Sequence, residues 1–231
     1  MLKTADSNSQ PPIADLLQQV KQFLRQGKYQ ETLAVCRRAL ETSPRSAEVY
    51  KWMGSAWQGL GDVQKAGNCY ARALEFAPNS VEAYANLGSL AATQQHWPAA
   101  IRYFQKAIAI NPKFAGAYRN LARVWQQVGR SSEALEAWYE ALRLAPQAVP
   151  LAEHLRLAQT LFDRGEWTRS IECWQRLPER DARLRSTAYR KMGEALQQLG
   201  KAQEAQVCFQ AANGNGAETL AGARGQETLA A

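Results

Sequence analysis

Apolar residues in this chain stand three or four positions apart in two separate stripes, and the pair of stripes recurs every 34 residues. In residues 81–114, one stripe spans 84–91 and the other spans 100–107. This spacing places the apolar side chains on one face of an α-helix. The pattern therefore predicts pairs of amphipathic helices, here called A and B, that are joined by short turns.

A proline closes each of the first four periods: Pro44, Pro78, Pro112 and Pro146. The residue before a proline disfavours the helical conformation, so each proline is expected to end helix B. With the proline numbered as position 32, the repeats span 13–46, 47–80, 81–114, 115–148, 151–184 and 186–212. One hairpin cannot bury its apolar stripe alone, so the units are expected to stack.

Small and aromatic residues recur at fixed positions of this period. Position 8, where a neighbouring helix crosses, holds Gly54, Gly88 and Ala122. Position 24 holds Tyr70, Phe104 and Trp138. This arrangement resembles the tetratricopeptide repeat, in which W-x2-L-G-x2-Y is followed by A-x3-F and then by a proline. The resemblance implies an all-α fold, an α-solenoid of about six helix-turn-helix repeats that forms a right-handed superhelix.

We expect one repeat domain over residues 13–212, flanked by a flexible segment 1–12 and a flexible low-complexity tail 213–231. Position 15 ends helix A and needs a residue that tolerates positive φ. It is glycine in every repeat except the third, where it is Gln95. After Pro146 the register slips by two residues, which predicts a distorted junction. Pro178 is expected to end helix B of the fifth repeat early.

Composition excludes several classes of protein. The net charge of +7 is spread along the chain, which indicates weak attraction to anions rather than a particular partner. The sequence has no run of about 18 apolar residues, so no membrane span is predicted. Its first residues lack the apolar stretch of a secretion signal. We therefore expect a cytoplasmic protein. Its cysteines lie at equivalent positions in different repeats and are interpreted as reduced, mostly buried thiols: Cys36, Cys69, Cys173 and Cys208.

No catalytic motif is present, so we expect no enzyme activity, no metal and no cofactor. Neither histidine has the spacing to cysteine or carboxylate residues that a metal site needs. His96 lies in a turn, and His154 takes a position that is tyrosine in other repeats, so we interpret His154 as a packing residue. The chain contains neither a GxSxG motif nor a phosphate-binding loop.

In the family that the chain resembles, the A helices line a concave face that binds peptides. Asn86 and Asn120 take position 6 of successive repeats, where amides can donate to and accept from a peptide backbone. They are similar to the asparagine ladder of O-linked N-acetylglucosamine transferases; the alternative is that they are solvated. Cations gather on the same face in repeats 4–6. The predicted peptide-binding residues are Lys51, Trp52, Asn86, Arg119, Asn120, Arg123, Arg156, Arg190 and Lys191.

The preferred hypothesis is a non-catalytic protein–protein interaction scaffold that binds an extended, acidic peptide or protein in its concave groove. One alternative is the substrate-targeting N-terminal arm of a larger enzyme, such as a bacterial glycosyltransferase or methyltransferase. The other is a weak nucleic-acid binder, which the absence of a basic tract disfavours. No membrane partner is expected.

Overall fold

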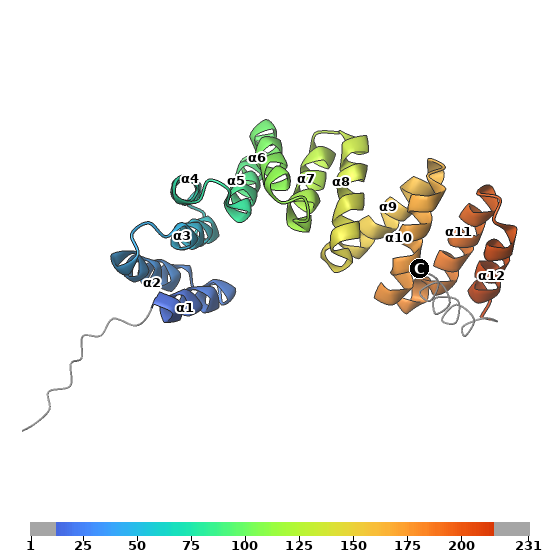
Figure 1. Cartoon of the computed structure of the whole chain (residues 1–231), viewed down its shortest axis with the longest axis horizontal. Coiled ribbons are helices and arrows are strands. Elements are labelled where there is room, and N and C mark those ends of the chain that lie inside the picture. Colours follow the sequence, from blue (N-terminus) through green and yellow to red (C-terminus); the bar gives the residue numbers. More distant parts are fainter. Residues whose placement is uncertain (1–12, 215–231) are drawn as a thin grey trace, which may run out of the picture. The chain divides into compact units, whose positions relative to one another are not determined.

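The computed structural model describes residues 13–214, in which helices are the only regular secondary structure (Figure 1). The α-helices are α1 (Ile13–Arg25), α2 (Tyr29–Thr42), α3 (Ala47–Gly59), α4 (Val63–Phe76), α5 (Val81–Thr93), α6 (Trp97–Ile110), α7 (Ala115–Gln127), α8 (Ser131–Leu144), α9 (Leu151–Asp163), α10 (Trp167–Arg180), α11 (Arg185–Gln198) and α12 (Ala202–Ala212). The predicted segment 1–12 and residues 215–231 of the predicted tail lie outside the described residues. The prediction of an all-α fold is confirmed.

The chain divides into two compact units, one that ends at Arg130 and one that begins at Ser131. In the first unit α1 packs on α2, α3 on α4 and α5 on α6; in the second, α9 packs on α10 and α11 on α12. Each of these pairs is one of the predicted repeats. The right-handed superhelix and the predicted domain boundaries stay predictions.

Local sequence signals explain where the helices begin. The Ser46 and Ser80 hydroxyls accept backbone hydrogen bonds from Val49 and Ala83, and Asp62 does the same for Lys65 at 3.0 Å. These side chains satisfy amide groups that have no partner within the helix. The A helices end in a left-handed residue as predicted. Between residues 13 and 214, Gln95, with φ of 59°, is the only non-glycine residue with positive φ.

The second, third and sixth hairpins are held together by a close contact between a glycine at position 8 of helix A and the aromatic ring at position 24 of helix B. A Cβ atom built on Gly54 would lie 2.5 Å from Cε1 of Tyr70, and one on Gly193 would lie 2.6 Å from Cε1 of Phe209. Real Cβ atoms do not approach rings so closely, so these positions require glycine. The predicted role of small residues at this position is confirmed.

The junction after the fourth repeat contains the two extra residues that the sequence predicted. A 3-10 turn, η1 (Pro146–Ala148), takes them up, and Val149 behind it is fully buried. The expectation for Pro178 is wrong, because α10 continues through it to Arg180. Pro178 lies in the last turn, where the missing N–H removes one hydrogen bond only, and Asp181 N–H closes the helix on the Leu177 carbonyl.

Substitution of Gly88 tests the contact between helices A and B. In Gly88→Ala the new methyl group would lie 2.7 Å from Cε1 of Phe104, so we expect a loss of about 1–3 kcal/mol in the free energy of unfolding. Gly67→Ala is the matched control, because its Cβ would lie at an ordinary 3.5 Å from Leu90. Alanine favours the helix there, and stability should rise by up to about 1 kcal/mol. Urea denaturation measures both; equal effects would contradict the assigned contact.

Candidate functional site

The predicted binding face of the first unit is formed by α3, α5 and α7, which contact one another in that order. Position 6 of α5 and α7 holds Asn86 and Asn120, and both side chains are half-buried. Asn120 donates from Nδ2 to Oγ of Ser89 at 3.3 Å, so it links α7 to α5. Asn86 makes no side-chain hydrogen bond within residues 13–214. Its amide therefore keeps both its donor and its acceptor for a ligand.

Arg119 and Arg123 lie one turn apart on α7. Arg119 is half-buried, whereas Arg123 is exposed and has no ion-pair partner among the described residues. The exposed carboxylates Glu48 and Glu82 stand in the first turns of α3 and α5. The negative side chains thus lie in the first turn of the A helices. Arg123 lies about two turns later in its own helix, α7.

Lys51 and Trp52 differ in how much they offer a ligand. Trp52 is only 8% exposed and packs with Leu16 and Val20 of α1, and Lys21 Nζ lies 5.3 Å from the centre of its ring. It therefore contributes mainly to the core. Lys51 is half-exposed at a shallow hollow of about 490 Å³, which is lined by Ala47, Glu48, Lys51 and residues 77–80.

In the second unit two of the predicted cations have an acidic partner on their own helix. Arg156 forms an ion pair with Glu153 at 2.5 Å, and Lys191 forms one with Glu194 at 2.8 Å. Lys191 Nζ also lies 4.4 Å from the centre of the Phe162 ring. Of the three cations, only Arg190 is exposed and without a partner within residues 131–214. The three-residue spacing of Glu153 and Arg156 could have shown this pairing.

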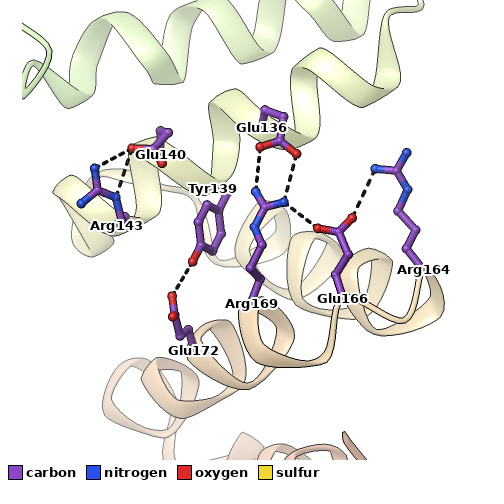
Figure 2. A network of polar contacts seen from close by, with 8 residues as sticks. All are labelled: Glu136, Tyr139, Glu140, Arg143, Arg164, Glu166, Arg169 and Glu172. Atoms are coloured by element: carbon purple, nitrogen blue, oxygen red, sulfur yellow. Dashed lines mark hydrogen bonds and ion pairs between the residues drawn. The ribbon is translucent and has the colours of Figure 1, made fainter. Parts of the chain in front are cut away.

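A second polar cluster lies between α8 and α10 of this unit (Figure 2). Arg169 makes bidentate hydrogen bonds to Glu136 at 3.0 and 2.8 Å, and it also pairs with Glu166 at 2.5 Å. Burial opposes the charge of Arg169, but its bonds to the two carboxylates outweigh this and raise its pKa. Tyr139 donates to Glu172, and burial and this bond raise the pKa of Tyr139 to about 12. Arg169 and Tyr139 therefore have their polar partners within this unit.

His154 is fully buried, as the packing interpretation predicted. A carbonyl can only accept, so Nε2–H donates to the Cys173 carbonyl at 2.9 Å, and Nδ1 accepts from Arg180 at 3.2 Å. Burial lowers the pKa of His154 to about 4, and the charges of Arg180 and Arg176 act in the same direction. His154 is therefore neutral near pH 7 and forms part of the core.

The cysteines are free, and three of them are buried: Cys36, Cys173 and Cys208. Burial raises the pKa of Cys36 and of Cys173 to about 12, so these thiols are protonated and unreactive. No group of three or more His, Cys, Asp or Glu side chains in the described part of the chain is placed to hold a metal ion. None of the helices between residues 13 and 214 is both long and apolar enough to cross a membrane.

Comparisons with known proteins agree with the repeat pattern. Three sequence-family models described as tetratricopeptide repeat match residues 23–90, 81–114 and 114–149. The fold is similar to that of pilF from Pseudomonas aeruginosa, with 17% identity, 94% of this chain and 97% of that chain covered, and a TM-score of 0.62. YrrB, a repeat protein of this type with an unusual peptide-binding site, has 16% identity, coverage of 83% and 97%, and a TM-score of 0.53.

A structure of MamA has 21% identity, coverage of 88% and 91%, and a TM-score of 0.50. At these identities the likeness concerns the fold alone. The sequence has no match among the curated proteins compared with it.

Titration of His154 should make stability depend on pH. Its pKa is about 4 in the folded chain and about 6.5 in the unfolded chain. The unfolded chain therefore binds more protons between these values, and stability falls as the pH falls through this window. We expect the protein to lose about 2 kcal/mol more than His154→Gln between pH 7 and pH 5. Urea unfolding at both pH values measures this, and equal losses would show that His154 is not the cause.

Proposed function

Because this chain belongs to the tetratricopeptide repeat family, we propose that it is a non-catalytic protein-interaction scaffold that binds an extended, acidic peptide along its A helices. Extended peptides present backbone N–H and C=O groups at regular intervals, and amide side chains can bond to both. Acidic side chains add charge-assisted hydrogen bonds to arginine. The candidate site supplies both kinds of group on neighbouring helices.

One observation carries the proposal: within residues 13–130 the Asn86 side-chain amide has no hydrogen-bond partner, and Arg123 has no carboxylate partner. An amide and a guanidinium that the fold does not use can bind a ligand without breaking an internal contact. Asn120 is already held in place by Ser89, so its orientation costs little entropy on binding. Arg119 and Lys51 extend the positive side of this face.

The second unit contributes in a different way. Arg190 is exposed and unpaired among its described residues, whereas Arg156 and Lys191 are balanced by Glu153 and Glu194. A peptide carboxylate would have to compete with these internal carboxylates. We therefore assign the main acidic contact to the first unit and a weaker one to Arg190.

The charge of α7 can be reversed to test the site. We expect Arg119→Glu with Arg123→Glu to weaken binding of a synthetic peptide of alternating Glu and Ser by about tenfold or more, since each lost charge-assisted bond is worth about 1.5–3 kcal/mol. Fluorescence anisotropy measures the dissociation constant, and circular dichroism confirms that helicity is kept.

The matched control for this variant is Arg45→Glu with Lys113→Glu, which makes the same charge change in two loops of the same unit. It should alter affinity by less than about twofold, because loop charges act only through the screened overall field. An equal loss of peptide affinity in both variants would show that the peptide is held only by the overall positive charge and not by this site. The double substitution Asn86→Ala and Asn120→Ala should lower the affinity for the acidic peptide and for a neutral peptide of the same length to the same extent.

A further inference from the structure

The B helices of the first unit carry exposed cations that the proposed peptide site does not use. Figure 1 shows α2, α4 and α6 along one side of this unit, with α1, α3 and α5 along the other. Position 26 of the repeat lies on the B helix, and in the first three repeats it holds Arg38, Arg72 and Lys106, which are all exposed. Arg37 and Arg102 are exposed on the same helices. We call this set the outer basic face: Arg37, Arg38, Arg72, Arg102 and Lys106.

Most of these cations lack an internal counter-charge. No acidic residue occurs in α6, although Arg102 and Lys106 lie four residues apart on it, a spacing at which like charges repel. Arg37 and Arg38 have no ion-pair partner within residues 13–214. Arg72 pairs with Glu75 and lies 5.5 Å from the centre of the Phe76 ring, so its guanidinium is held in place. The face thus carries a net positive charge that destabilises the free helices slightly.

In the second unit, charged residues at the equivalent positions of a B helix form ion pairs within the unit. On α8 the equivalent positions 22 and 26 hold Glu136 and Glu140, and each has an arginine partner, Arg169 and Arg143 (Figure 2). The cations at the same positions of α6 have none. Repulsion without compensation inside the unit is relieved when a partner of opposite charge binds.

We propose that the outer basic face is a second docking surface and that its partner is a glutamate- or aspartate-rich segment of another protein. The chemistry of the face favours a protein over other polyanions. Glu41 and Glu75 stand three residues after Arg38 and Arg72, so a continuous phosphate backbone would be pressed against them. A peptide can place its carboxylates opposite the cations and keep them away from Glu41 and Glu75. The exposed residues between the cations include Ala34 and Ala71, and the aromatic side chains of α2, α4 and α6 are all buried or half-buried, which disfavours stacking on bases and insertion into a bilayer.

The proposal is tested on the full chain with a polyglutamate peptide as the probe. A nitrogen-15 NMR titration should shift amide signals of α2, α4 and α6, and these shifts should persist when Arg119→Glu and Arg123→Glu disable the A-helix site. In that background, the combined substitutions Arg38→Glu, Arg102→Glu and Lys106→Glu should lower the affinity for polyglutamate by about tenfold or more. Lys28→Glu, Lys113→Glu and Arg185→Glu are the matched control, since these exposed cations lie outside the outer basic face, and the expected change is below about twofold.

Three results would overturn the proposal. The first is an equal loss of affinity in the control triple, and the second is the absence of shifts in α2, α4 and α6. The third is duplex DNA that binds more tightly than polyglutamate and depends on the same cations, which would assign the face to nucleic acid. If the charge-reversed triple fails to fold, Arg38→Gln, Arg102→Gln and Lys106→Gln give the same comparison. Loss of A-helix binding alone affects the proposed function and leaves this inference intact.

Discussion

The close approach of helices A and B in the second, third and sixth hairpins is the contact on which the rest of the structure depends. An aromatic ring on helix B lies against a glycine on helix A, as Phe104 does against Gly88 and Tyr70 against Gly54. This contact fixes the distance between the two helices, and therefore which residues remain on the two outer sides of the hairpin. Both proposed binding surfaces are what is left exposed once the aromatic rings are buried.

The sequence predicted the features that arise from steric limits. Small residues at position 8, positive φ at position 15 and helix boundaries set by prolines each follow from a few atoms that cannot occupy the same space. The burial of His154 was predicted for the same reason, because its position holds a large packed residue in other repeats. The period therefore located almost every element of the fold.

The parts that the sequence did not predict depend on weaker energies. Pro178 removes one hydrogen bond and does not stop α10, because the packing of Leu177 and Trp174 holds the last turn. Arg156 and Lys191 were expected to be available cations, but neighbouring Glu153 and Glu194 neutralise them. Trp52 was expected to face a ligand and instead lies against α1. Such outcomes depend on rotamers and contacts between repeats, which a periodic pattern does not encode.

Gln95 gives the third hairpin a property that the other hairpins lack. Its backbone is left-handed at φ of 59°, where the other turns have glycine, and this conformation costs a residue with a side chain about 1–2 kcal/mol. That free energy is released whenever the turn opens. Hydrogen exchange in the native state would therefore begin early between α5 and α6. These two helices carry Asn86 on one side and Arg102 and Lys106 on the other, so a ligand on either face would slow the same local opening.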